Sequence, residues 1–217
     1  MSRSATVELR AIEQIAEMKR VYSVIDSSLP DSVSKCLVVA SASPGEGKTL
    51  VAAGLASLAA QQHDQRVLCI DLNWRQPALH KHFGLDLSFG LTDLKPAQSL
   101  LDFAQPSGIE HLDILTAPKL NEENDQIMGN RGLSATEIMT QAREAYDMVI
   151  IDTSAILPTN RSMVDPVTFS KAADGIVLLV LNYVTPKQDV KRAYMILETS
   201  GARVLGVVVN QWKNPIL

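Results

Sequence analysis

The stretch VVASASPGEGKTLVAAGLASLAA, residues 38–60, decides the fold of this 217-residue chain. A strand-like apolar run gives way to small and flexible residues, and an alanine-rich pattern typical of a helix follows. Gly45 and Gly47 let successive backbone N–H groups turn toward one centre, and the start of the following helix adds positive potential there. A strand, a glycine-rich turn ending in Gly-Lys-Thr and a helix form the context of a phosphate-binding P-loop.

Each residue type in this loop has a predicted contact. Lys48 is expected to bridge the β and γ phosphates, and Thr49 to offer its hydroxyl to Mg²⁺. Ala42 stands where the simplest pattern has its first glycine, and the alternative is a strand-to-helix turn with an incidental lysine. We therefore expect ATP or GTP as ligand, and the predicted nucleotide-binding residues are Pro44, Gly45, Glu46, Gly47, Lys48, Thr49 and Leu50.

Short apolar runs recur along the chain, at residues 36–40, 67–70, 112–115, 148–151, 176–181 and 204–209. They are continuously apolar, which is typical of strands that helices cover on both faces. Helical patterns lie between them, at residues 49–62, from a capping box at Ser134 to about Tyr146, and from Thr185 to a stop at Gly201. We therefore predict an α/β fold, a doubly wound and mostly parallel sheet flanked by helices, as in P-loop NTPases.

The N-terminal segment differs from the rest. We predict an amphipathic helix in residues 1–25 and a nucleotide-binding domain in residues 26–217. An apolar stripe at intervals of three or four residues carries this prediction, and its members are Val7, Ala11, Ile15, Met18, Tyr22 and Ile25. Such a stripe fits a helix packed on its own domain and equally a contact with another subunit or a partner.

Composition excludes several classes of protein. The formal net charge is −4 and the basic residues are scattered, so the chain lacks the electrostatic footprint of a nucleic-acid binder. The longest apolar run, residues 176–181, falls far short of the roughly 20 residues that span a bilayer. We expect no transmembrane segment, no secretory signal and a cytoplasmic location. Cys36 and Cys69 lie in apolar runs, which indicates buried thiols.

Two acids follow predicted strands at the same edge of the sheet. Asp152 has the position of a Walker B acid that holds Mg²⁺, usually through water. The alternative is an ordinary aspartate in the turn after the strand. Asp71 ends another strand, where ligands of open α/β sheets bind, and is the candidate general base and metal contact.

Several motifs together resemble one family. They are the P-loop read as Ser-x-x-Pro-Gly-Glu-Gly-Lys-Thr, DLNWRQPALHKHFGL at residues 71–85, GLTD at 90–93, YDMVIIDT at 146–153 and ADG at 173–175. The chain resembles bacterial tyrosine kinases, cytoplasmic P-loop kinases of capsule and exopolysaccharide export, over residues 17–210. The resemblance implies ATP-dependent tyrosine autophosphorylation, ring-like homo-oligomers and activation by a membrane polysaccharide co-polymerase, which would hold the protein at the inner membrane. In the family, catalysis corresponds to Lys48 with Thr49, Asp71 and Asp152.

The chain departs from the family's pattern at three places. Asn73 replaces the second aspartate of the middle motif; its carbonyl oxygen can coordinate a metal ion, but it cannot take a proton. Residues 211–217 contain no tyrosine, so we expect no self-phosphorylation of a C-terminal tail, and a tyrosine on another protein stays open as the substrate. Residues 17–20 resemble the start of the family's oligomerisation motif, whose second arginine is Ser23 here.

Two other functions compete with the kinase. A partition or septum-positioning ATPase shares the architecture, but its signature lysine in the P-loop is Ser43 in this chain. A nucleotide-gated scaffold would bind ATP and regulate export while transferring little phosphate. Asn73 and the absence of tyrosine from residues 211–217 favour the scaffold.

Other candidate residues keep two interpretations each. Arg75, a candidate catalytic residue, could counter phosphate charge or pair with an acid, and Asn210 could meet the purine or cap a turn. Trp74 could cover the site or pack in the core, and packing is favoured. His80 and His82 are interpreted as surface histidines, because residues two apart on a helix do not face each other as metal ligands do.

Overall fold

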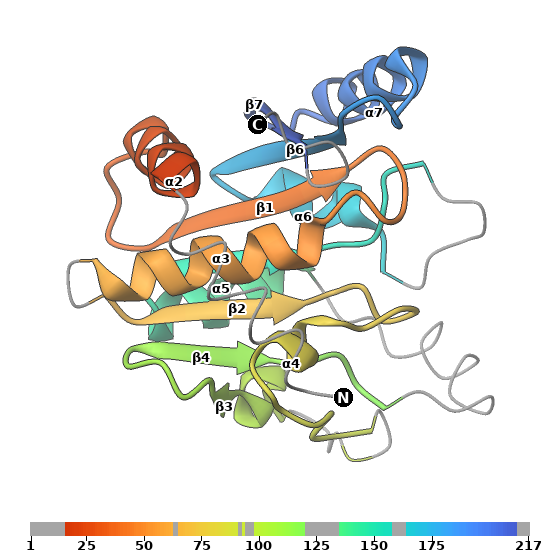
Figure 1. The fold of residues 1–217 in the computed structure, drawn as a ribbon. Helices are drawn as coiled ribbons and strands as arrows, with labels where there is room; N and C mark the ends of the chain where they lie inside the picture. Colours follow the sequence, from red (N-terminus) through yellow and green to blue (C-terminus); the bar gives the residue numbers. More distant parts are fainter. Residues whose placement is uncertain are drawn as a thin grey trace.

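The computed structural model describes residues 16–62, 65–90, 93, 98–119, 135–157 and 164–211. The described chain forms a seven-stranded sheet in the order β3-β4-β2-β5-β1-β6-β7, with helices on both faces (Figure 1). All neighbours pair in parallel except β3, which runs antiparallel to β4. The strands are β1 (Lys35–Ser41), β2 (Val67–Asp71), β3 (Gln105–Pro106), β4 (Leu112–Leu115), β5 (Met148–Asp152), β6 (Gly175–Leu181) and β7 (Val204–Asn210). The predicted doubly wound α/β fold is confirmed.

The central strands are buried on both faces, as their unbroken apolar sequences predict. In β2 and β5 every residue is buried, and β1 is buried after its first residue. All six predicted strands occur, and β1, β2, β5 and β7 each continue one residue beyond the predicted end, into polar Ser41, Asp71, Asp152 and Asn210. Strand β3 was not predicted, because two residues including a proline carry no strand pattern.

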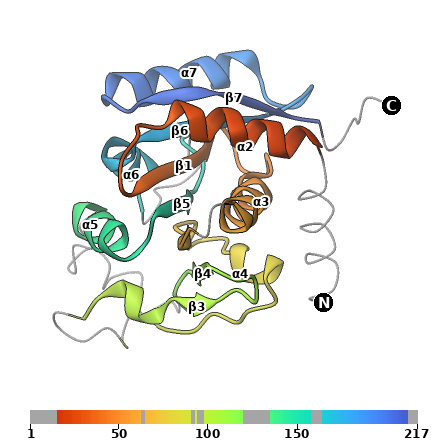
Figure 2. The same cartoon turned by 90° about the vertical axis from the view of Figure 1, so that its left-hand side faces the viewer.

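Helices divide between the two faces of the sheet (Figure 2). Alternate residues of β1 point to opposite sides: Leu37 and Val39 pack with α2 and α3, and Cys36 and Val38 pack with α5, α6 and α7. The helical elements are α2 (Ala16–Ser28), α3 (Lys48–Gln61), α4 (Leu79–His82), the 3₁₀ helix η2 (Leu100–Phe103), α5 (Ala135–Ala145), α6 (Pro166–Ala172) and α7 (Lys187–Thr199). The sequence did not predict α4, η2 and α6, which are short.

Helix α3 is the centre of one layer. Eleven of its fourteen residues are buried, because it lies between the sheet and α2. Its alanines keep the helix thin enough to pack on both neighbours. This packing fixes the start of α3, and therefore the P-loop, against the carboxyl end of β1.

The described part of the N-terminal stripe belongs to the core. Met18, Tyr22 and Ile25 of α2 are buried in the same cluster as the residues of α3, whereas Val24 is exposed. Helix α2 continues past residue 25 to Ser28. The stripe members Val7, Ala11 and Ile15 lie outside the described residues, as do Ser134 and most of the loop before it.

The structure confirms the predicted burial of the cysteines and shows where α7 begins and ends. Cys36 and Cys69 are fully buried free thiols, as predicted. Helix α7 starts at Lys187, and Gly201 follows its end with φ of 84°, but Thr185 does not cap the helix.

No helix within the described ranges has the length and apolar character needed to cross a membrane.

Candidate nucleotide-binding site

The P-loop connects the end of β1 to the start of α3. Gly45 and Gly47 have φ of 77° and 93°, the left-handed conformations that favour glycine. A Cβ atom on Gly47 would lie 2.5 Å from Nδ2 of Asn210, so a side chain at this position would displace that amide. Glycine at both positions therefore allows the turn of the loop that the sequence analysis expected.

Lys48 is held inside the loop. Its side chain is buried, and Nζ donates a hydrogen bond of 2.8 Å to Oγ of Ser41 at the end of β1. Burial lowers the pKa of Lys48, while the carboxylates of Asp152 and Glu46 act in the opposite direction. An ammonium group so little solvated gains strongly from an anionic ligand such as a phosphate.

Asp152 lies beneath the P-loop at the end of β5. Its Oδ2 accepts a hydrogen bond of 2.7 Å from Oγ1 of Thr49, and its Oδ1 is buried with no hydrogen-bond partner among the described residues. Burial raises the pKa of Asp152, and the neighbouring carboxylate of Asp71 raises it further. Asp71 and Asp152 are register partners on β2 and β5, so the two predicted acids are adjacent.

Asp71 turns toward the backbone of its own loop. Its Oδ1 accepts the N–H of Asn73 at 2.9 Å, and its Oδ2 accepts the N–H groups of Ala78 and Leu79, each at 3.2 Å. Burial raises the pKa of Asp71, although these hydrogen bonds act in the opposite direction. The carboxylate thus organises the segment between β2 and α4, and its roles as base and metal contact remain predictions.

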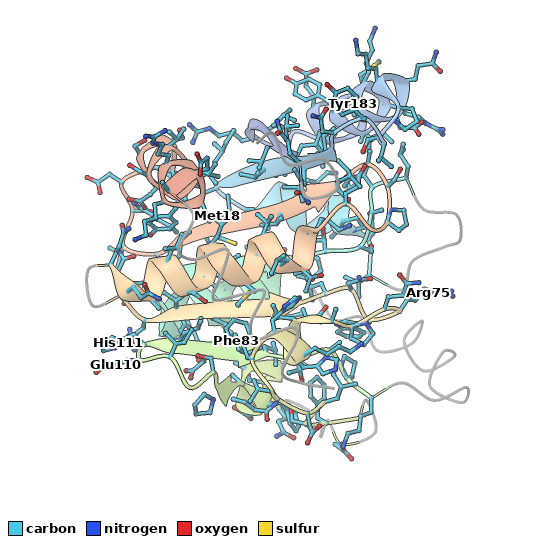
Figure 3. The ribbon with its side chains drawn as sticks, viewed as in Figure 1. Met18, Arg75, Phe83, Glu110, His111 and Tyr183 are labelled. Atoms are coloured by element: carbon cyan, nitrogen blue, oxygen red, sulfur yellow. The ribbon has the colours of Figure 1, made fainter. Side chains whose placement is uncertain are left out.

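The residues after Asp71 differ in their placement. Asn73 is half-buried, and its Nδ2 donates to the carbonyl oxygen of Gln76 at 3.1 Å. Trp74 is buried in the core and its Nε1 donates to the carbonyl oxygen of Asp71, so it packs and does not cover the site. Arg75 is exposed at the same edge of the sheet, and no acid of the described chain pairs with it (Figure 3).

These segments line one cavity of about 450 Å³. The predicted residues that line it are Pro44, Gly45, Gly47, Lys48, Thr49, Leu50, Asn73 and Arg75. Four predicted residues do not line it: Glu46 is buried within the P-loop, and Asp71, Asp152 and Asn210 are the last residues of β2, β5 and β7. The cavity also contacts residues that sequence reasoning missed, namely Gln76, Ala78, His82, Ser154 and Ala155.

The two histidines of α4 are partly exposed. His80 is half-buried, its Nδ1 is buried without a hydrogen-bond partner among the described residues, and burial lowers its pKa. His82 is half-buried and lines the cavity. Both histidines are therefore partly exposed, and the sequence could not predict that one of them faces the cavity, because α4 is a single helical turn without a period.

The donor set fits a nucleotide with Mg²⁺. A hydroxyl from Thr49 and a carboxylate from Asp152 are the hard oxygen ligands that Mg²⁺ takes in P-loop sites. The buried Oδ1 of Asp152 has no partner among the described residues, which a metal-bound water would supply. The residues present therefore fit Mg²⁺ bound beside a phosphate chain.

Comparisons with known proteins agree with this geometry. Residues 37–215 match the family described as CbiA, the CobQ/CobB/MinD/ParA nucleotide binding domain. The tyrosine-protein kinase YwqD of Bacillus subtilis is 33% identical over 195 residues, which cover 89% of this chain and 79% of YwqD. The succinoglycan biosynthesis transport protein ExoP of Rhizobium meliloti is 30% identical over 86% of this chain, which spans only 23% of ExoP.

A solved structure shows the same likeness in three dimensions. The chimerical protein CapA2B2 superimposes with a TM-score of 0.74 at 30% sequence identity, over 91% of this chain and 84% of the chimera. The family match covers the P-loop, both acids and β7. The chain therefore belongs to the CobQ/CobB/MinD/ParA nucleotide-binding family and, within it, to the bacterial tyrosine kinases.

Proposed function

We propose that this chain binds ATP with Mg²⁺ in the P-loop cavity and transfers the γ-phosphoryl group to a protein tyrosine. The observation that carries the proposal is the pairing of Thr49 with Asp152 beneath the loop, because Asp152 keeps a buried oxygen without a partner among the described residues. Mg²⁺ would neutralise charge on the phosphates when bound. The sequence similarity to YwqD, which is named a tyrosine-protein kinase, supports tyrosine as the phosphoryl acceptor.

Each residue has a defined task in the proposed transfer. Lys48 exchanges its hydrogen bond to Ser41 for contacts with the phosphates, and Arg75, which also lines the cavity, counters their charge. The phenol oxygen forms a bond to the γ phosphorus while the bond from that phosphorus to the β–γ bridging oxygen breaks. ADP leaves, and the phenol proton passes to a carboxylate, for which Asp71 is the candidate.

The biological setting extends this proposal. ExoP is named for succinoglycan biosynthesis and transport, and the chain is 30% identical to it. We infer that the protein acts in exopolysaccharide or capsule export, forms homo-oligomers and is activated by a membrane polysaccharide co-polymerase. That partner would place it at the inner face of the membrane.

A second function is favoured by one observation. The Asn73 amide, at the position of an expected acid, is turned to the Gln76 carbonyl and supplies no negative charge to the cavity. A nucleotide-gated scaffold that binds ATP and transfers little phosphate would need no acid there. The partition ATPase is disfavoured, because the chain is 33% identical to YwqD, which is named a tyrosine-protein kinase, and because Ser43 replaces the signature lysine.

Incubation with γ-labelled ATP separates these functions. The protein is tested alone and with a tyrosine-bearing partner protein, and free phosphate and phosphotyrosine are measured separately. The kinase predicts label on tyrosine that requires Mg²⁺ and is absent from Lys48→Ala. Release of free phosphate without labelled tyrosine would contradict the kinase and favour an ATPase, and binding without turnover would favour the scaffold.

A further inference from the structure

Glu46 is a buried carboxylate within the P-loop. Only 2% of its surface is exposed, although its neighbours Pro44 and Gly45 are exposed. One carboxylate oxygen, Oε2, accepts the N–H of Ser43 at 3.0 Å, and the other is hydrogen-bonded to the hydroxyl of Thr185. A buried charge is stable only when such partners replace its lost hydration, so these two contacts fix the carboxylate in place.

The turn between β6 and α7 orients the hydroxyl group of Thr185. Its Oγ1 accepts the N–H of Leu181 at 3.0 Å, so its single proton is available for the carboxylate of Glu46. The turn itself is tight. Val184 and Thr185 both donate their N–H groups to the carbonyl oxygen of Leu181, and Tyr183 has φ of 59°.

The left-handed conformation of Tyr183 shows how firmly this turn is held. A tyrosine rarely adopts it, and it persists only where surrounding contacts determine the backbone. The residue is 86% exposed. The hydrogen bonds of the turn, and not packing of Tyr183, therefore place Thr185 against Glu46.

Asn210 holds the backbone of Glu46. Its Nδ2 donates a hydrogen bond of 3.0 Å to the carbonyl oxygen of Glu46 and lies 2.5 Å from the position that a Cβ atom on Gly47 would take. Its own carbonyl oxygen accepts the N–H of Asn182, so the end of β7 is tied to the turn that carries Thr185. Glu46 is thus fixed at its side chain by one segment and at its backbone by another.

We propose that Thr185 and Asn210 are positioning residues that hold the P-loop in its phosphate-binding conformation through Glu46. This inference rests on the proposed nucleotide site. Because Glu46 lies between Gly45 and Gly47, fixing it keeps both glycines in left-handed conformations before a ligand arrives, and less conformational freedom is lost on binding. The two side chains act on the phosphate cradle, so their loss weakens adenine and guanine nucleotides alike.

The test measures binding of Mg·ADP and Mg·GDP by calorimetry, with thermal unfolding in parallel. Thr185→Val removes the hydroxyl and is expected to weaken both nucleotides by about tenfold or more, since hydrogen bonds to charged groups contribute that much. Thr185→Ser keeps the hydroxyl and should restore binding. Thr168→Val is the matched control, because the hydroxyl of Thr168 also meets a carboxylate, that of Asp165, on the exposed side of α6.

Asn210→Ala distinguishes positioning of the P-loop from recognition of the purine. If Thr185→Val fails to fold, this second variant still tests the proposed positioning. Positioning predicts that the ratio of ADP to GDP affinity stays within about twofold of wild type while both affinities fall. In a steady-state assay the KM for ATP rises while kcat changes little. A changed ratio of ADP to GDP affinity in Asn210→Ala overturns the proposal. So does a folded Thr185→Val protein that binds both nucleotides as tightly as wild type.

Lys48→Ala separates this inference from the site on which it rests. Weakened binding in Lys48→Ala together with normal binding in Thr185→Val overturns positioning alone. Unchanged binding in a folded Lys48→Ala overturns the nucleotide site, and the positioning role with it.

Discussion

Asp152 combines two properties that oppose each other. It is fully buried beside Asp71, so its ionised form is poorly solvated and repelled, and its pKa is raised. In the proposed function, the same carboxylate would hold Mg²⁺ through water. In the proposed function, a charge that destabilises the metal-free fold would therefore stabilise the metal-bound state.

Replacing Asp152 with asparagine should stabilise the metal-free protein. Because the folded-state pKa lies above the unfolded value, the contribution of Asp152 to stability is present at acid pH and is lost as the pH rises through the raised pKa. We expect Asp152→Asn to raise the free energy of unfolding by about 1–3 kcal/mol above neutral pH, with a smaller gain in acid. Urea denaturation in a chelator measures it, and ADP affinity should become independent of Mg²⁺. A wild type more stable than Asp152→Asn in alkali would contradict this account.

Asn73→Asp should raise turnover. An aspartate cannot donate to the Gln76 carbonyl as the Asn73 amide does, so the side chain would be released toward the cavity that it already lines. There it adds a negative ligand and a proton acceptor, and general-base assistance contributes about a hundredfold to ten-thousandfold in rate. We expect higher Mg²⁺-dependent ATP turnover, measured as released ADP.

Two outcomes would contradict the interpretation of Asn73. Unchanged turnover in Asn73→Asp, together with efficient transfer to a partner tyrosine by wild type, would show an ordinary kinase with an external substrate. Binding of ATP without turnover in both proteins would favour the scaffold.

The positions of site residues in the fold were predictable where a motif fixes the backbone geometry. Lys48 and Thr49 lie at the start of a helix after a strand, and Asp152 at the end of another, so their positions follow from the order of the elements. The orientation of Asp71 toward three N–H groups could not be predicted, because it depends on the path of the loop after β2. The contact between Glu46 and Thr185 joins residues 139 positions apart, and no local pattern records it.

Among the elements, α2 connects the N-terminal segment to the core. Tyr22 is almost completely buried, with 1% of its surface exposed, and burial raises its pKa to about 12. Its hydroxyl has no hydrogen-bond partner among the described residues, so its contribution to stability comes from packing on α3. The described part of this helix is thereby tied to the nucleotide-binding domain.

Tyr22→Ala should lower the free energy of unfolding by about 3–5 kcal/mol, as large-to-small changes at buried aromatic residues do. Tyr22→Phe keeps the packing and is expected to cost less than about 1 kcal/mol. Val24→Ala is the control on the same helix, because 65% of Val24 is exposed. Chemical denaturation measures all three, and a loss of self-association with unchanged stability in Tyr22→Ala would show instead that the stripe serves subunit contact.

Elements with strong patterns were predictable and short ones were not. Apolar runs of four or more residues marked every predicted strand, and their positions agree with the structure to within one residue at each end. β3 and α4 have two and four residues, which is too few to show a period. Helix α6 had a usable signal, Asp165 as N-cap followed by Pro166, that the sequence analysis did not use.

At the scale of the whole molecule, the order of the strands assembles the site. β1 and β5 are neighbours in the sheet although more than a hundred residues separate them, and β2 pairs with the other side of β5. The P-loop and both acids therefore emerge at one edge. The same topology brings β7 and the β6–α7 turn against the P-loop, so the nucleotide site is in direct contact with the outer strands of the sheet.

The measurement that tests the central claim most directly is calorimetric titration of Mg·ATP into wild type and Lys48→Ala. The cavity around Lys48 fits a phosphate chain, and loss of a charged hydrogen-bond donor typically weakens binding by about tenfold to a hundredfold. The account predicts clear binding by wild type and a loss of that size in Lys48→Ala, with unfolding curves showing that the variant remains folded. Equal affinity in a folded Lys48→Ala protein would contradict the assignment of this cavity as the nucleotide site.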